Sequence, residues 1–453
     1  MIAARFDRFY FVGIGGIGMS AIARLLLQRG FAVAGYDKTP SDITDALTAE
    51  GAQISFIDSI DTIPAAQRDV QRTLVVSTPA VPAQQQIPAY FLAQGYEMVK
   101  RAKALGMLTA DGITLAVAGT HGKTTTTTLI AHLMEVAQYK FTALLGGLST
   151  NYGSNLLSSG TDYFVTEADE FDRSFLQLQP AYAAITSMDA DHLDIYGDAA
   201  SMHQAYAAFA ALVTRKLVYQ VNAPLPLPAG IATQAYGPGA TIHASNIRIQ
   251  NGRFVFDYQG NQTINDIICG MPGLHNIENA LAAITLVLEI GLKPETIRQG
   301  MASFKGVKRR FELVYEGASK VFIDDYAHHP TEIEALLNSV RVLYPGKKLL
   351  GIFQPHLFSR TRDFMAGFAS SLSQLDSCLL LDIYPARELP IEGISSAVLL
   401  GQITCEKQLV AKSDLLAAVA GQTFDVLLTI GAGDIDRWVQ PLAEQLQKQE
   451  VMA

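Results

Sequence analysis

The sequence predicts an α/β protein of three domains: a Rossmann-like N-terminal domain, a central P-loop-type α/β domain with an antiparallel β addition, and a Rossmann-like C-terminal domain. The chain has 453 residues, about three times the roughly 150 residues of one domain. Short apolar strands alternate with helix-forming runs in three series. A polar, glycine-containing stretch divides the first series from the second. We place the domains at residues 1–108, 109–311 and 312–453.

Composition and charge exclude several classes of protein. Hydrophobic residues make up 49% of the chain and charged residues 17%, which suits buried cores and excludes a disordered chain. The formal net charge of −9 argues against nucleic acid as a partner, because that requires a basic surface. Cys269, Cys378 and Cys405 lie far apart and form no CxxC pair, so neither a disulfide framework nor a zinc site is expected.

The location of the protein is also constrained. No apolar run approaches the ~20 residues that span a bilayer. Arg5 and Arg8 precede the first apolar run, but that run leads into glycines rather than into a small-residue cleavage site, so we expect neither a signal peptide nor membrane insertion. A soluble protein of the reducing cytoplasm is the expectation. The oligomeric state stays open.

The first series is a βαβ unit, with strands expected at 9–13 and 31–36 and a helix at 19–29. Its first turn has the pattern GxGxxG, and an acid ends the second strand. Glycines there let the backbone approach a diphosphate, which the positive end of the following helix stabilises. The pattern suits NAD and a UDP-sugar equally, and a tight turn without a ligand is the alternative. The candidate residues are Gly15, Gly16, Ile17, Gly18 and Asp37.

The second series carries a more informative turn, between a strand at 113–118 and a helix at about 124–136. Backbone N–H groups, an ammonium and a hydroxyl converge there, and phosphates with Mg²⁺ are their natural occupants. The first glycine lies two positions later than GxxxxGK[ST] requires, so the loop is a variant. An ordinary glycine-rich turn would leave the lysine and the threonine run unexplained. The loop consists of Gly119, Thr120, His121, Gly122, Lys123, Thr124 and Thr125.

Acidic clusters follow in the same domain. One comes directly after an apolar run at 163–166, and the second surrounds a histidine. Carboxylates at a strand end beside a phosphate loop suit Mg²⁺, with the histidine as a further ligand, whereas solvated acidic loops are the alternative. The members are Glu167, Asp169, Glu170, Asp172, Asp189, Asp191, His192 and Asp194. Further on, Asn251-Gly252 is flanked by two strand-like runs and predicts an antiparallel hairpin.

The third series has strands expected at 320–325, 348–353, 378–383 and 425–430 and a helix at 330–343. Polar groups follow its strands, where ligands bind in open α/β sheets. These groups are Asp324, Asp325, Tyr326, His328, His329, His356, Arg360 and Arg362. A surface salt-bridge loop is the alternative for the arginines. A motif before this series holds His275, Asn276 and Asn279, for which helix capping by Asn276 is the alternative.

The ordered motifs GIGGIGMS, AGTHGKTTTT, EADEFD, DADHLD, LHNIENA, KRRFE, DDYAHHPTE and FQPHLFSRTRD together resemble the Mur ligases. The resemblance runs from about residue 9 to 435. It implies a UDP-substrate domain, a central ATPase domain and a C-terminal Rossmann-like domain, in agreement with the three α/β series. The first and last motifs point to the alanine-adding branch. The stretch from Asp189 to Thr214 holds no lysine, which fits that branch and leaves open the ligands of a second Mg²⁺.

Roles for individual residues follow from the resemblance. It implies that the first glycine turn binds the UDP diphosphate, that Lys123 contacts the β and γ phosphates of ATP, and that Thr124, Glu167 and His192 hold Mg²⁺. It also implies an adenine side formed by His275, Asn276 and Asn279. Arg310 would lie on the phosphate side and Asp325 would face the nucleotide. The amino-acid end would consist of Tyr326, His328, His356 and Arg360.

The implied reaction is ATP-dependent ligation of L-alanine to the lactyl carboxylate of UDP-N-acetylmuramate through an acyl phosphate, in peptidoglycan precursor synthesis. Lys123, Glu167, His192 and Arg310 would be the catalytic residues, acting by positioning and charge neutralisation. Two alternatives remain at this point. An NAD-dependent oxidoreductase would use the first glycine turn and Asp37 but leaves the Lys123 loop unexplained. A nucleotide switch would bind ATP and form no amide.

Overall fold

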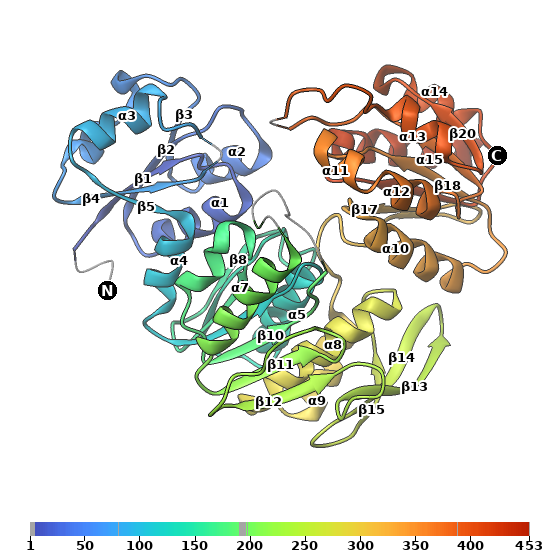
Figure 1. Cartoon of the computed structure of the whole chain (residues 1–453), viewed down its shortest axis with the longest axis horizontal. Coiled ribbons are helices and arrows are strands. Elements are labelled where there is room, and N and C mark those ends of the chain that lie inside the picture. The colour runs from blue at the N-terminus through green and yellow to red at the C-terminus, as the bar shows by residue number, and fades with distance from the viewer. Residues whose placement is uncertain (1–4, 80, 190–195, 197, 387, 453) are drawn as a thin grey trace. The chain divides into compact units, whose positions relative to one another are not determined.

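The computed structural model describes residues 5–79, 81–189, 196, 198–386 and 388–452, and it is mixed α/β throughout (Figure 1). Contacts within the chain divide it into two compact units. The first consists of residues 1–246, 256–267 and 278–304, and the second of residues 247–255, 268–277 and 305–453. The predicted fold class, α/β with Rossmann-like elements, is confirmed. The predicted division into three domains stays a prediction.

The first sheet is parallel throughout, with strand order β3-β2-β1-β4-β5. Its strands are β1 (Arg8–Val12), β2 (Ala32–Tyr36), β3 (Gln53–Ser55), β4 (Thr73–Ser77) and β5 (Glu97–Lys100), and its helices are α1 (Ile17–Gln28), α2 (Asp42–Ala49), α3 (Gln86–Ala93) and α4 (Arg101–Thr109). Because β1 and β4 are buried on both faces, they read as continuous apolar runs. The predicted domain boundary at 108 falls within the last turn of α4.

The second sheet belongs to the same unit and has the order β12-β11-β10-β6-β9-β7-β8, with β8 antiparallel to β7. Its strands are β6 (Ile113–Ala118), β7 (Phe141–Leu144), β8 (Leu156–Ser158), β9 (Tyr163–Ala168), β10 (Tyr182–Ile185), β11 (Lys216–Gln220) and β12 (Ala232–Tyr236). Its helical segments are α5 (Lys123–Val136), the 3₁₀ segment η4 (Phe171–Gln177), α7 (Ala199–Ala211) and α9 (Pro294–Ser303). Strands β6 and β9 are parallel neighbours, with Ala118 opposite Ala168. Their carboxyl ends therefore meet at one edge.

A separate three-stranded sheet has the order β13-β14-β15. It consists of β13 (His243–Gln250), β14 (Arg253–Gln259) and β15 (Ile264–Ile268), and helix α8 (Leu274–Glu289) follows it. Asn251 and Gly252 join the first two strands with φ of 51° and 72°, values that a type I′ hairpin turn requires at both central positions. The predicted hairpin is confirmed.

The sheet of the second unit has the order β16-β17-β21-β18-β19-β20, and only β16 runs antiparallel to its described neighbour. Its strands are β16 (Glu312–Glu316), β17 (Val321–Asp325), β18 (Leu349–Phe353), β19 (Ser377–Leu380), β20 (Glu406–Leu409) and β21 (Val426–Ile430). Its helices are α10 (Pro330–Leu343), α11 (Phe358–Asp363), α12 (Met365–Leu372), α13 (Ser396–Gln402), α14 (Leu415–Ala420) and α15 (Val439–Met452). Among the described helices, none combines the length and apolar character needed to cross a bilayer.

A buried histidine ties three elements of the first unit together. His132, on α5, is 3% exposed. Its ring nitrogens lie 2.7 Å from the Tyr152 hydroxyl and 2.9 Å from the Ser303 hydroxyl at the end of α9. Burial lowers the pKa of His132 to about 4. The folded protein therefore holds this ring neutral at pH values where the unfolded chain protonates it.

Acid should weaken the protein through this residue. Between pH 6.5 and pH 4 the unfolded chain binds a proton that folded His132 does not, so stability falls as pH drops through this window. By linkage the loss from this group at pH 5 is about 2 kcal/mol. Urea unfolding at pH 7.5 and 5.0 should show a pH dependence smaller by that amount in His132→Gln. An identical pH dependence in both proteins would contradict the assignment.

Candidate active site

The glycine turn between β1 and α1 closes on two charged side chains. The Gly15 amide donates to Asp37 Oδ2 at 2.8 Å, and Asp37 directly follows β2. A Cβ on Gly15 would lie 2.9 Å from that oxygen, and a Cβ on Gly18 would lie 2.8 Å from Arg101 Nη1. A side chain at either position would therefore displace the Asp37 carboxylate or the Arg101 guanidinium from its place at the turn. The structure brings Gly15, Gly18 and Asp37 together as expected, whereas no sequence motif marks Arg101.

The Lys123 loop lies at the carboxyl end of β6 and begins α5. Gly119 and Gly122 have φ of 138° and 81°, where side chains other than hydrogen are strained. A Cβ on Gly122 would also lie 2.4 Å from Asn279 Oδ1. Asn279, expected on the adenine side of the site, thus lies against this loop. Thr124 and Thr125 occupy the first turn of α5, and both are buried.

The segment after β10 fixes the same loop from a second direction. The His121 amide donates to Ser187 Oγ at 2.7 Å, and the Thr120 and Ser187 hydroxyls lie 2.9 Å apart. The imidazole Nε2 of His121 lies 3.3 Å from Asp189 Oδ2. Ser187 was not predicted, because a lone serine after a strand carries no recognisable signal. The predicted residues 190–195, among them Asp191, His192 and Asp194, lie outside the described residues.

Lys123 is paired with a buried acid. Its Nζ lies 2.9 and 2.8 Å from the two carboxylate oxygens of Glu170, which is 1% exposed, and it also donates to the carbonyl of Gly119. Burial lowers the pKa of Lys123, but Glu170, followed by Asp169 and Glu167, raises it above its ordinary value overall. The ammonium therefore stays charged within the loop. The sequence placed Glu170 among Mg²⁺ candidates, and the structure places it on the lysine.

Glu167, near the end of β9, faces a different group. Its Oε1 accepts a hydrogen bond of 3.0 Å from the Gly146 amide, after the end of β7. Among the described residues, no group of three His, Cys, Asp or Glu side chains could hold a metal ion. Mg²⁺ is commonly held by one or two carboxylates, with waters and substrate phosphates completing its shell. Glu167 fits such a ligand, and Thr124 and His192 stay predictions.

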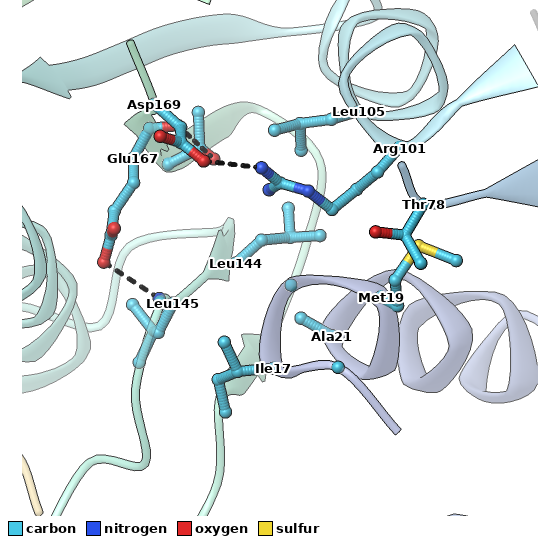
Figure 2. A pocket seen from close by; sticks show the side chains of 14 residues that line it. Ile17, Met19, Ala21, Thr78, Arg101, Leu105, Leu144, Leu145, Glu167 and Asp169 are labelled. Atoms are coloured by element: carbon cyan, nitrogen blue, oxygen red, sulfur yellow. Dashed lines mark hydrogen bonds and ion pairs between the residues drawn. The ribbon is translucent and has the colours of Figure 1, made fainter. Parts of the chain in front are cut away.

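A cavity of about 260 Å³ joins the glycine turn to this acid (Figure 2). Glu167 and Asp169 lie on one side of it in Figure 2, and Arg101 points across it toward Asp169. The remaining lining residues are Gly16, Ile17, Gly18, Met19, Ala21, Thr78, Leu105, Leu144, Leu145, Gly146 and Thr166. The predicted diphosphate turn and the predicted metal ligand therefore share one cavity.

In the second unit, an arginine and an acid meet at the carboxyl end of β17. Asp325 accepts hydrogen bonds of 2.7 Å each from the amides of Phe311 and Ala327. Burial raises the pKa of Asp325 to about 6, and the nearby Arg310 opposes that rise. The Arg310 guanidinium lies 4.9 Å from the centre of the Tyr326 ring, within cation–π range. The structure thus groups three of the predicted residues, and their roles stay predictions.

Aromatic rings extend this group across the sheet edge. Tyr326 lies 5.4 Å from His328, His328 lies 6.3 Å from His356, and His356 stacks on Tyr384 at 5.7 Å, measured between ring centres. Arg360 Nη1 lies 3.5 Å from His356 Nδ1. Burial lowers the pKa of His328 to about 4. The four residues predicted for the amino-acid end therefore form one cluster, to which the structure adds Tyr384.

The remaining motif lies at the start of α8. Asn276 is within the first turn of that helix and donates to the carbonyl of Pro272 at 2.6 Å. It therefore lies inside the helix rather than before it, and its role, capping or ligand binding, stays a prediction. His275 Nδ1 lies 3.5 Å from the Ser339 hydroxyl, and burial lowers the pKa of His275 to about 4. Its role on the adenine side stays a prediction.

Three family models match the chain over most of its length. They are described as Mur ligase family, catalytic domain (residues 8–112), Mur ligase middle domain (117–287) and Mur ligase, glutamate ligase domain (309–433). The chain belongs to the Mur ligase family. The glycine turn, the Lys123 loop and the Arg310 cluster lie in three different matched regions.

Individual Mur ligases match at full length. The chain is 48% identical to the UDP-N-acetylmuramate–L-alanine ligase of Flavobacterium johnsoniae, over 98% of each chain, and 49% identical to that of Porphyromonas gingivalis, over 97% of this chain and 99% of the relative. The crystal structure of the UDP-N-acetylmuramate–alanine ligase of Thermotoga maritima matches with a TM-score of 0.83 at 26% identity, over 98% of this chain and 99% of that one. A murein peptide ligase from Psychrobacter arcticus shares the fold, with a TM-score of 0.73 at 22% identity, over 97% and 98%.

Removing Lys123 should destabilise this Mur ligase, because the buried carboxylate of Glu170 then loses the opposite charge beside it. Lys123→Met should cost about 3 kcal/mol of unfolding free energy, because removal of one partner leaves an uncompensated carboxylate. Adding Glu170→Gln should recover part of that loss. A matched cycle on the exposed pair Lys100 and Asp172 should show a coupling below about 1 kcal/mol. Additive losses at Lys123 and Glu170 in urea unfolding would contradict this account.

Proposed function

We propose that this chain ligates L-alanine to the lactyl carboxylate of UDP-N-acetylmuramate with conversion of ATP to ADP and phosphate, in cytoplasmic peptidoglycan precursor synthesis. The carboxylate attacks the γ-phosphorus of ATP, and ADP leaves. The amine of alanine then attacks the acyl carbon of the resulting acyl phosphate. An amide forms, the C–O bond to phosphate breaks, and the amine loses a proton.

One observation carries the proposal: the glycine turn and Glu167 line the same cavity of about 260 Å³. A sugar nucleotide bound at the turn can then present its acid beside the residue proposed to face the γ-phosphate. The reacting groups are thereby held together, which replaces a bimolecular encounter by an oriented one. The names of the full-length relatives support the same reaction.

The Lys123 loop is proposed to hold the triphosphate. Its backbone amides, the start of α5 and the ammonium offer positive charge to phosphate oxygens. In the structure Glu170 neutralises that ammonium, so phosphate binding must draw Lys123 Nζ at least partly away from Glu170. Because both carboxylate oxygens contact Nζ, Glu170 can keep one contact and orient the lysine while the phosphates take the other directions.

Magnesium is proposed at Glu167, with Thr124 and His192 as further ligands, where it would neutralise charge that develops on the transferring phosphoryl group. The hydrogen bond from the Gly146 amide to Oε1 orients the Glu167 carboxylate at the wall of the cavity. Arg310 is proposed on the phosphate side and Asp325 facing the nucleotide. The amino-acid end is proposed at Tyr326, His328, His356 and Arg360, where a neutral imidazole can accept the proton of the attacking amine.

The oxidoreductase alternative has lost its support. It would use the first glycine turn and Asp37 but leaves the Lys123 loop unexplained. Membership of the Mur ligase family accounts for both glycine turns together. A nucleotide switch would leave the cluster of Tyr326, His328 and His356 without a use.

The decisive variant is Lys123→Ala. Loss of this charge should lower ADP formation by on the order of 10²-fold or more, while UDP-N-acetylmuramate binds as before. The assay supplies ATP, Mg²⁺, UDP-N-acetylmuramate and L-alanine, and it measures ADP by coupled absorbance and the amide product by mass spectrometry. The matched control is Lys140→Ala, which removes an exposed lysine of the same matched region. Full turnover by Lys123→Ala, or phosphate release without any amide product, would refute the proposal.

A further inference from the structure

The cavity beside the glycine turn is predominantly negative. Its wall carries the carboxylates of Glu167 and Asp169, and Arg101 is the one cation among the described residues that line it. A sugar nucleotide brings further negative charge into this space. A nearby cation is needed to hold it, because an anion in a partly closed cavity is otherwise repelled by like charges.

Arg101 is placed to supply that cation. It is the first residue of α4 and directly follows β5. Its Nη2 lies 2.8 Å from Asp169 Oδ2, and its Nη1 lies over Gly18, where a Cβ would stand 2.8 Å away. The guanidinium therefore spans the space between the first turn of α1 and the end of β9. The Arg101 side chain is 28% exposed, so a ligand can reach the guanidinium.

The pair with Asp169 is suited to exchange. Both side chains are partly exposed, at 28% and 33%, and partly exposed pairs contribute little net stability. An arginine pairs bidentately with phosphate oxygens as readily as with a carboxylate. Replacement of Asp169 by a diphosphate thus trades one charge-assisted contact for a stronger one, beside the positive end of α1.

The ion pair of Arg101 with Asp169 is not needed to hold α4 against η4, because other contacts already do so. The neighbouring Lys100 already contacts Asp172 at 2.6 Å. Helix α4 also packs closely on η4, since a Cβ on Gly106 would lie 2.2 Å from the carbonyl oxygen of Gln177. These contacts join the two segments outside the cavity. Arg101, by contrast, lies at the wall of the cavity.

We propose that Arg101 binds the diphosphate of the sugar nucleotide, exchanging Asp169 for a phosphate oxygen, and that Gly18 is glycine to admit this guanidinium. The inference rests on the proposed function, because it takes the sugar nucleotide to occupy this cavity. It adds a residue outside the glycine motif to the site. It also gives Gly18 a second role, since the absent side chain makes room for a cation as well as for a phosphate.

Calorimetric titration of the full chain without ATP tests this. The probes are UDP, UDP-N-acetylglucosamine and UDP-N-acetylmuramate, which share the diphosphate and differ in the sugar acid. Arg101→Ala should weaken all three by roughly ten- to hundredfold, the effect of losing one charged hydrogen bond. Gly18→Ala, which crowds the guanidinium, should weaken all three as well. Lys100→Ala is the matched control and should bind each probe within about twofold of the unaltered chain.

A second variant distinguishes ligand binding by Arg101 from a purely structural role of this residue. Asp169→Asn leaves Arg101 in place and removes its competing charge, so the affinity for UDP should rise. If Arg101 only braced the fold, Asp169→Asn would weaken UDP as Arg101→Ala does, and the inference would fail. It would fail too if Arg101→Ala bound UDP unchanged, or lost affinity for UDP-N-acetylmuramate alone, which would place Arg101 on the acid. Should UDP-N-acetylmuramate not bind the unaltered chain, the proposed function itself would fall.

Discussion

The ammonium of Lys123 and the carboxylate of Glu170 set the arrangement of the site. Neither charge is tolerable in its buried position without the other, because an unpaired buried ion costs several kcal/mol. The pair is made possible by the sheet: β6 and β9 run parallel in register, so the turn after one meets the acids after the other. The carbonyl of Glu170 in turn accepts the Tyr196 hydroxyl at 2.6 Å. The Lys123 loop is thus fixed from the strand that also carries Glu167.

From that strand end the chain reaches the cavity of Figure 2. Asp172 and Arg173 adopt φ of 52° and 54° at the start of η4, a conformation that costs of order 1 kcal/mol for each such residue. Three acids of this segment contact three different cations: Glu170 contacts Lys123, Asp169 contacts Arg101 and Asp172 contacts Lys100. Three charged contacts from one short segment therefore connect the Lys123 loop, the cavity and α4.

The sequence predicted the helices and strands better than the contacts between side chains of different elements. The ranges 113–118 and 330–343 coincide with β6 and α10, because apolar runs bounded by glycine or proline specify both ends. The strand expected at 378–383 begins at Ser377 and ends at Leu380, although Leu381 and Ile383 beyond its end are apolar and buried. Arg101, Ser187 and Tyr384 were missed, because each matters through a partner far along the chain. The alignment of β6 with β9 could be suspected from the βαβ pattern, but the contact of Lys123 with Glu170 could not.

The acid and the γ-phosphate are proposed to react within one cavity, and the path of an oxygen atom tests that proposal most directly. UDP-N-acetylmuramate with both lactyl carboxylate oxygens replaced by ¹⁸O is incubated with ATP, Mg²⁺ and L-alanine, and the inorganic phosphate is analysed by mass spectrometry. The account predicts one ¹⁸O atom in each phosphate released, and one retained in the amide carbonyl. Phosphate free of ¹⁸O would mean that water or another group received the phosphoryl, which would contradict the central claim.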